Sequence, residues 1–159
     1  MTINVSRLFH IEIVVRDADA AADFLERVFG AKRVQEDFAS FLSGSFNKVV
    51  HVELGQTVLQ FIEPLVDYGL WAEHLQKKGP GVHNLTFIVD DVEAAAAALE
   101  KEGAPTLLKF NLDWSKLEPA ENLKDAWPPV YMIGGEETVG FRFELGESPT
   151  KGKNRFIPE

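Results

Sequence analysis

The sequence of 159 residues contains no cysteine. This absence excludes disulfides, thiolate metal ligands, cysteine nucleophiles and iron–sulfur clusters. Any metal ion would therefore be held by histidine, carboxylate or amide side chains. A chain without cysteine also fits a reducing compartment, and we expect a cytoplasmic protein.

Basic residues are scarce, with 16 Lys and Arg against 25 Asp and Glu, so the formal net charge is -9. Nucleic acids and anionic membrane surfaces are poor partners for such a chain, and we expect neither. No apolar run reaches the roughly 18 residues of a membrane span, and the N-terminal segment lacks the pattern of a signal peptide. The composition, 45% hydrophobic and 26% charged, is that of a folded globular protein.

The chain contains an internal repeat. Residues 9–26 read FHIEIVVRDADAAADFLE, and residues 83–100 read HNLTFIVDDVEAAAAALE. Each copy begins with a run rich in Ile, Val and Phe, which is typical of a strand. An Ala-rich segment follows, which favours a helix. Each half of the chain is therefore expected to begin with a strand and a helix.

The ends of both helices carry recognisable signals. Asp17 or Asp19 in the first copy, and Asp91 in the second, can cap a helix by accepting hydrogen bonds from free backbone N–H groups. Gly30 and Gly103 stand where helices commonly end.

Further strands complete each half, and Gly55-Gln56 and the GGEET segment are candidate turns between them. We expect these strands at 32–42, 48–54, 57–63, 106–110, 129–133 and 139–145, with a linking helix at 67–78. The predicted fold is α+β, with two βαβββ modules, and the family resemblance described below implies that they form a curved mixed sheet around a central pocket. The expected boundaries are 1–66 for the first module, 67–81 for the linker, 82–148 for the second module and 149–159 for a loosely held tail.

Strand alternation gives four of these strands an apolar face, and each places a metal-competent or amide residue on the opposite face. These residues are His10, Gln60, Asn84 and Glu144. The repeat relates His10 to Asn84 and Gln60 to Glu144. If the two copies form one sheet, the four side chains can converge within it.

Several segments together resemble a known superfamily. They are HIEIVVRDADAAADFLERVFGA, QFIEP, LWAEHLQKKGPGVHNLTFIVDDVEAA and VGFRFELGE. The sequence resembles the vicinal oxygen chelate superfamily, which includes glyoxalase I, bleomycin-resistance proteins, extradiol dioxygenases and methylmalonyl-CoA epimerase. The resemblance covers most of residues 8–146, and the epimerase branch is the most similar.

The resemblance implies a divalent metal ion (Co, Mn, Zn, Ni or Mg) with His10, Gln60 and Glu144 as ligands. The epimerase branch has two consecutive histidines, the second of which binds metal, where this chain has His83-Asn84. Aligning the repeats places Asn84 at the fourth ligand position. Its carbonyl oxygen is a weaker ligand than imidazole for transition metals and shifts the preference towards harder ions.

The resemblance also implies a catalytic base. The branch carries a glutamate on its third strand, but that strand reads KVVHVEL here, so His51 is a candidate general base. Glu144 is a ligand or a base. Glu12 and Arg142 are candidate substrate-binding residues, and Arg142 either pairs with Glu12 or holds a substrate carboxylate. His74 is expected at the surface.

Residues 109–128 form an irregular insertion that contains Trp114 and Trp127. It is either a surface excursion or the wall of a binding pocket, and we count both tryptophans as candidate substrate-binding residues.

Two functions remain open. The first is a metal-dependent isomerase, epimerase or lyase that acts through an enolate of a small carbonyl or thioester substrate. The second is a metal-free binding or resistance protein that sequesters an aromatic small molecule. An Fe(II) dioxygenase is the least favoured, because Asn84 leaves its ligand set incomplete. The resemblance further implies a homodimer.

Overall fold

The structure of the protein is a computed structural model, which describes residues 2–34 and 42–152. The chain divides into two compact units. One comprises residues 10–84, and the other comprises the residues up to Phe9 together with those from Leu85 onward. Within the described ranges, no helix has the length and apolar character needed to cross a membrane. Each unit is described in turn.

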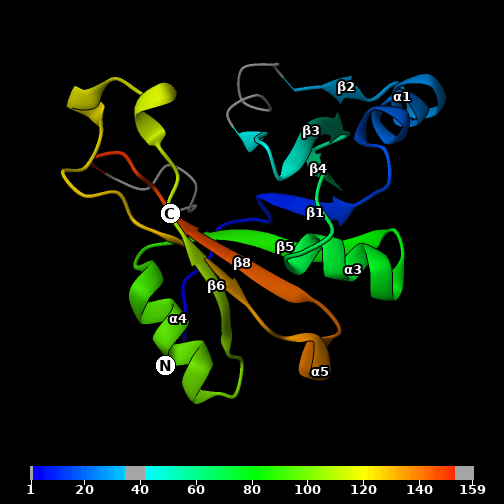
Figure 1. The fold of residues 1–159 in the computed structure, drawn as a ribbon. Helices are drawn as coiled ribbons and strands as arrows, with labels where there is room; N and C mark the ends of the chain where they lie inside the picture. The colour runs from blue at the N-terminus through cyan, green and yellow to red at the C-terminus, as the bar shows by residue number, and fades with distance from the viewer. Residues whose placement is uncertain (1, 35–41, 153–159) are drawn as a thin grey trace. The chain divides into compact units, whose positions relative to one another are not determined.

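The first unit contains a βαβββ module followed by a helix (Figure 1). Its strands have the order β2-β3-β4-β1, with β1 parallel to β4 and the other pairs antiparallel. The elements are β1 (His10–Val14), α1 (Ala18–Phe29), β2 (Lys32–Arg33), β3 (Asn47–Leu54), β4 (Thr57–Pro64) and α3 (Leu70–Lys78).

Helix α1 begins and ends where the sequence indicates. The side chain of Asp17, not that of Asp19, accepts a hydrogen bond from the N–H of Ala20 at 2.9 Å. At the other end, Gly30 adopts a left-handed conformation with φ of 66°, which glycine reaches without a steric penalty. Asp19 instead forms ion pairs with Arg33 and Lys48.

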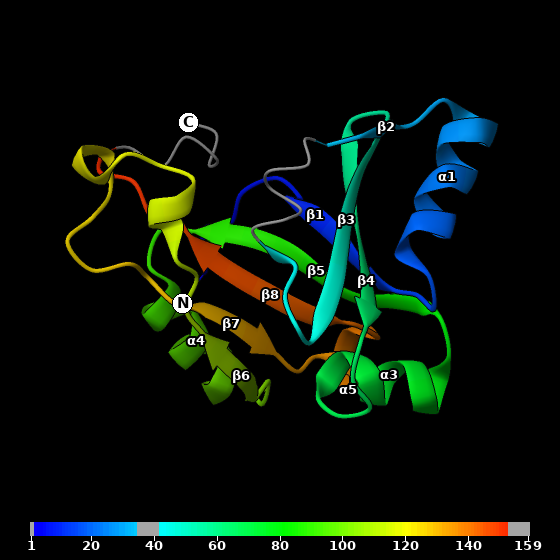
Figure 2. The ribbon, with the colours of Figure 1, turned by 45° about the horizontal axis from the view of Figure 1, so that its top comes forward.

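One face of this sheet packs against α1, which runs along β3 and β4 in Figure 2. The buried apolar cluster on that face comprises Ala18, Ala22, Val50, Val52 and Phe61, with Ile13 and Leu59 at its margin. Since successive strand residues point to opposite faces, His10 and Glu12 lie on the face away from α1. Helix α3 contributes Trp71 to that second face, where it contacts Glu12.

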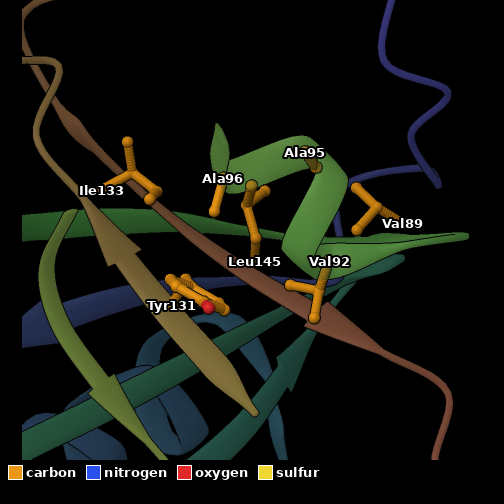
Figure 3. Packing of buried hydrophobic residues seen from close by; sticks show 7 residues of the cluster. All are labelled: Val89, Val92, Ala95, Ala96, Tyr131, Ile133 and Leu145. Carbon is orange, nitrogen blue, oxygen red and sulfur yellow. The ribbon is translucent and has the colours of Figure 1, made fainter. Parts of the chain in front are cut away.

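The second unit repeats the pattern. Its strands have the order β5-β8-β7-β6, and β6, β7 and β8 are antiparallel. Helix α4 packs on β7 and β8 over a cluster that includes Tyr131, Ile133 and Leu145 (Figure 3). The elements are β5 (Gly81–Val89), which begins in the first unit, then α4 (Val92–Lys101), β6 (Thr106–Phe110), two 3-10 turns (Trp114–Lys116 and Ala120–Asn122), β7 (Val130–Ile133), α5 (Glu136–Val139) and β8 (Arg142–Glu147).

A glutamate at the end of each module's last strand adds a second cap to its helix. Glu63 accepts a hydrogen bond from the N–H of Ala18, and Glu147 accepts one from the N–H of Val92, both at 3.0 Å. The two glutamates are separated by the same number of residues as Gln60 and Glu144. Each carboxylate therefore satisfies an N–H group that the helix leaves unbonded and offsets the positive end of its dipole.

The α+β prediction is confirmed, and both halves follow the predicted order of strands and helix. Three details differ. The expected strand at 32–42 is seen only as β2, and residues 35–41 lie outside the described residues. The GGEET turn contains the short helix α5, so β8 begins at Arg142 rather than at 139. Gly103 follows the end of α4, which is capped by Glu102.

The described part of the expected tail is bound to the insertion. The N–H of Lys124 donates to the carbonyl of Pro149 at 2.9 Å, and the N–H of Lys151 donates to the carbonyl of Asn122 at 2.8 Å. Leu123, buried, forms a bridge with Thr150. The expectation that the chain is loosely held from Pro149 onward is therefore wrong for residues 149–151.

Candidate functional site

The second face of the first unit carries a group of buried polar side chains. His10 and Glu12 come from β1, His51 from β3 and Gln60 from β4, and all four are buried. Gln60 is directly opposite Glu12 on one neighbouring strand and opposite His51 on the other. Polar groups removed from water are costly unless they are hydrogen-bonded or hold a ligand, so this face is a candidate functional site.

Gln60 and His51 contact each other, with the Nε2 atoms of the two side chains 2.8 Å apart. The amide nitrogen can only donate, so His51 accepts through Nε2 and carries its proton on Nδ1. In this arrangement the carbonyl oxygen of Gln60 points away from His51. The ring of His10 lies edge-on to that of His51, with the centroids 6.2 Å apart.

Burial lowers the pKa of His51 to about 3, and the nearby charge of His10 contributes in the same direction. At neutral pH the imidazole is therefore uncharged, which agrees with its role as an acceptor from Gln60. A general base works best when its pKa is near the operating pH. His51 lies on β3, where this pKa makes it a weak base, and its role as the general base stays a prediction.

Glu12 is the centre of a second buried group. Its Oε1 atom is 2.6 Å from Nε1 of Trp71, 2.8 Å from Nδ1 of His83 and 2.6 Å from Nδ2 of Asn84. Glu12 is 2% exposed and Asn84 is fully buried. A carboxylate in such a place is stabilised by several donors at once. The structure thus gives Glu12 three partners within its own unit.

Two histidines near this group differ in their surroundings. His83 is buried, and its ring centroid is 5.9 Å from that of Trp71. His74 was expected at the surface. It is only partly exposed, because its ring packs at 5.3 Å, centroid to centroid, against His83.

The remaining predicted residues belong to the second unit. Glu144 on β8 is buried, and the hydroxyl of Thr86 on β5 donates to its carboxylate at 3.2 Å. Leu145, the next residue, faces the opposite way into the core under α4, as the alternation predicts. Arg142 forms an ion pair with Glu136 of α5, a partner that the sequence did not indicate.

Trp114 and Trp127 lie in the irregular segment between β6 and β7. Trp114 opens a 3-10 turn that Asp113 caps by accepting from the N–H of Ser115. Both indole rings are partly exposed. Their role in binding a substrate stays a prediction.

Within the first unit, the predicted ligands His10, Gln60 and Asn84 offer one imidazole and two amide side chains, which are donor types that divalent cations accept. Among residues 2–34 and 42–152, no group of three or more His, Asp or Glu side chains could hold a metal by itself. The predicted ligand set differs from such a group, because two of its four ligands, Gln60 and Asn84, are amide side chains. In both amide side chains the nitrogen already forms a hydrogen bond. The nitrogen of Gln60 bonds to His51, and the nitrogen of Asn84 bonds to Glu12. The carbonyl oxygen, the end of an amide that binds cations, therefore points away from each partner.

Comparison with known proteins identifies the family. Residues 9–111 match the model of the Glyoxalase/Bleomycin resistance protein/Dioxygenase superfamily. This match spans more than half of the chain. The chain therefore belongs to this superfamily, and the predicted resemblance is confirmed.

The curated relatives that match this chain include two methylmalonyl-CoA epimerases, which belong to one branch of the superfamily. The chain is 36% identical to human mitochondrial methylmalonyl-CoA epimerase over 100 residues, which are 62% of this chain and 55% of the human protein. It thus spans about half the length of the curated relatives it matches.

Solved structures agree on the fold. Methylmalonyl-CoA epimerase from Mycobacterium tuberculosis superimposes with a TM-score of 0.62 at 21% identity, over 95% of this chain and 93% of that one. A variant of Streptomyces coelicolor methylmalonyl-CoA epimerase with one glutamate replaced by glutamine, solved with 2-nitronate-propionyl-CoA, gives a TM-score of 0.61 at 21% identity, over 91% of this chain and 98% of that one.

Proposed function

We propose that the protein is a metal-dependent isomerase of the epimerase type, which moves a proton next to a carbonyl or thioester group through an enolate. The likeness to the epimerase branch supports an isomerase reaction. The metal dependence and the enolate mechanism are supported by the buried polar face of the first unit. On that face His10, His51 and Gln60 lie on neighbouring strands, opposite the core.

In this proposal His10, Gln60 and Asn84 of the first unit are ligands of a divalent cation, and the fourth predicted ligand, Glu144, stays an expectation from the family resemblance. The cation would act as a Lewis acid on the substrate carbonyl, which makes the adjacent C–H more acidic. The two amides supply carbonyl oxygens whose orientation is set by His51 and Glu12. Burial of these groups keeps water from competing with the substrate oxygen.

We assign proton removal first to Glu144 and keep His51 as the second candidate. A carboxylate can accept the proton from one face of the substrate carbon, and inversion then requires that a proton be added to the opposite face of the enolate. Thr86 orients this carboxylate by a hydrogen bond at 3.2 Å. His51 is the weaker base because burial lowers its pKa to about 3. Its contact with Gln60 gives it a separate role in orienting a ligand.

The substrate we propose is a small carbonyl compound or thioester, and methylmalonyl-CoA is the first compound to test because the human relative bears its name. Arg142 is the candidate residue for a substrate carboxylate, which would compete with Glu136 for the guanidinium group. Trp114 and Trp127 remain candidate substrate contacts. A homodimer and a cytoplasmic location stay parts of this proposal, and light scattering tests the first.

A second candidate is a metal-free protein that sequesters an aromatic molecule. The observation that favours it is the pair of partly exposed tryptophans in the insertion. Elemental analysis of protein purified without chelators separates the two functions, because only the first requires a stoichiometric divalent metal.

The decisive experiment is hydrogen exchange at the carbon next to the thioester. The protein is incubated with methylmalonyl-CoA in D2O, and deuterium uptake is followed by mass spectrometry. We expect uptake with the wild type and Mn2+, loss of uptake in Glu144→Gln and His10→Ala, and retained uptake in His51→Gln. If Glu144→Gln keeps full deuterium uptake and His51→Gln loses it, then His51, not Glu144, is the residue that removes the proton. Full activity in His10→Ala would exclude the proposed site.

A further inference from the structure

We infer that Glu136 is an internal competitor for the guanidinium group of Arg142. Its carboxylate holds Arg142 in the free protein, and the carboxylate of an acidic substrate displaces it. The inference rests on the proposed function, because it concerns the residue proposed there to bind a substrate carboxylate. It adds a residue to which the sequence assigned no role, and it makes a free carboxyl group the feature by which the substrate is recognised.

Arg142 lies on the same face of β8 as Glu144, the residue to which we assign proton removal. Phe143 and Leu145 pack on the cluster under α4, and successive strand residues point to opposite faces. Arg142 and Glu144 therefore point to the other face, with Cα atoms about 7 Å apart along the strand. A ligand carboxylate at Arg142 would thus lie beside the carboxylate proposed to remove the proton.

Glu136 reaches Arg142 from the segment between β7 and β8. Its Oε1 atom accepts a hydrogen bond from Nε of Arg142, and its Oε2 atom accepts one from the N–H of Gly135 at 3.1 Å. The side chains of Glu136 and Arg142 are 28% and 19% exposed, so the pair is partly shielded from water. Burial raises the pKa of Glu136, but hydrogen bonds from backbone N–H groups and from Arg142 lower it further. The net shift is downward, so the carboxylate is ionised at neutral pH.

The side chain of Glu136, rather than the segment that carries it, is the part that moves in this inference. Gly135 packs closely against the strand, because a Cβ atom there would lie 2.7 Å from the carbonyl oxygen of Phe141. The N–H groups of Thr138 and Val139 also donate to the carbonyl of Gly135. Rotation about the side-chain bonds of Glu136 needs no change in this backbone. Displacement of its carboxylate therefore leaves the β7–β8 connection in place.

An anionic ligand can exchange with Glu136, whereas a neutral one cannot. A ligand carboxylate restores the charge-assisted bond to the guanidinium group, and the released carboxylate of Glu136 regains water. A neutral acyl group offers no such replacement. An intramolecular competitor acts at an effective concentration in the millimolar range, so it weakens the binding of an anionic ligand without preventing it. Such weakening suits an isomerase, because substrate and product carry the same carboxylate and the product must leave.

The test measures the affinity of the full chain for two thioesters that differ only in the carboxylate. They are methylmalonyl-CoA and propionyl-CoA, and calorimetry in the presence of Mn2+ gives the dissociation constants. The variants are Glu136→Gln, Arg142→Gln, the double variant and Glu137→Gln. The last is the matched control, because it makes the same change in the same short helix at an exposed position. Circular dichroism checks the fold of each variant.

We expect Glu136→Gln to lower the dissociation constant of methylmalonyl-CoA at least threefold and to leave that of propionyl-CoA within twofold. Arg142→Gln should weaken the binding of methylmalonyl-CoA at least tenfold and that of propionyl-CoA less than twofold. The double variant should match Arg142→Gln, because without the guanidinium group there is nothing for Glu136 to occupy. Glu137→Gln should keep both constants within twofold. The comparison of Glu136→Gln with Glu137→Gln tests the inference even if Arg142→Gln does not fold.

An unchanged or raised dissociation constant for methylmalonyl-CoA in Glu136→Gln would overturn the inference. An equal gain of affinity in Glu137→Gln would also overturn it, because the effect would then be one of net charge. If the wild type takes up deuterium in either case, the proposed function stands. If the wild type shows no uptake but the variants follow the expected pattern of affinities, the proposed function fails and the inference holds. A wild type that binds neither thioester would refute both.

Discussion

The amide nitrogen of Gln60 lies 2.8 Å from Nε2 of His51, and the two residues are directly paired across β3 and β4. A buried neutral imidazole therefore determines which atom of Gln60 points towards the candidate site. Glu12 has the corresponding effect on Asn84. In both cases a residue beside a predicted ligand decides the chemistry that the ligand can offer.

The low pKa of His51 predicts a loss of stability in acid. Its pKa is about 3 in the folded protein, against 6.5 for an unperturbed imidazole. Between these values the unfolded chain binds a proton that the folded chain does not, so the free energy of unfolding falls as the pH falls. The slope approaches about 1.4 kcal/mol per pH unit.

Urea unfolding of the chelated protein between pH 7.5 and 5.5 measures this slope. Carboxylates are largely ionised in that range, so they contribute little. His51→Gln, which removes the imidazole, should show a clearly flatter dependence than the wild type. Parallel curves for the two proteins would mean that His51 is not the residue responsible.

Metal binding should stabilise the fold. A ligand that binds only the folded state adds about 2.7 kcal/mol at a concentration 100 times its dissociation constant. Differential scanning fluorimetry should therefore show a higher midpoint with Mn2+ than with EDTA. The shift should vanish in His10→Ala. A shift of the same size in this variant would place the metal elsewhere.

Glu63, next to the last residue of β4, and Glu147, the last residue of β8, should stabilise the two repeat helices by similar amounts. Replacing Glu63 or Glu147 by Ala removes a charged acceptor from an N–H at a helix start, at an expected cost of about 1 kcal/mol each. Urea unfolding at pH 7 measures this cost. Glu53→Ala, at an exposed position of β3, is the control and should change little. If Glu63→Ala or Glu147→Ala lowers the free energy of unfolding by less than Glu53→Ala does, the hydrogen bond from that glutamate to the helix does not stabilise the protein.

Gly135, before α5, should not tolerate a side chain. A Cβ atom there would lie 2.7 Å from the carbonyl oxygen of Phe141 and 2.9 Å from the ring of Phe143. We expect Gly135→Ala to lower the free energy of unfolding by about 1–3 kcal/mol, because the backbone must move. Gly134→Ala is the neighbouring control, since its nearest contacts are at 3.4 Å with Pro105. Equal effects at both positions would contradict the steric explanation.

The order of strands and helices was predictable because its signals are local. Alanine-rich helices, capping aspartates and alternating strands depend on residues within a few positions of one another. The strand alternation likewise placed His10 and Gln60 on the face opposite the core, where the structure has them. The short helix α5 was missed because a Gly-rich segment with two glutamates is also typical of a turn.

The contacts that give these residues their properties were not predictable. Nothing near Glu12 in the sequence indicates that Trp71, His83 and Asn84 donate to it, and the pairing of Arg142 with Glu136 was equally hidden. Trp71 was visible only as one residue of an expected helix.

The sequence by itself determined the duplicated α+β pattern, the family and the faces on which the polar side chains lie, because periodicity and capping act over a few residues. Only the tertiary structure decided that His51 is neutral, that Gln60 and Asn84 have committed nitrogens, and that Glu12 is held by three donors. These properties depend on burial and on hydrogen bonds between strands and a helix that are distant in the chain, and folding alone brings such groups together.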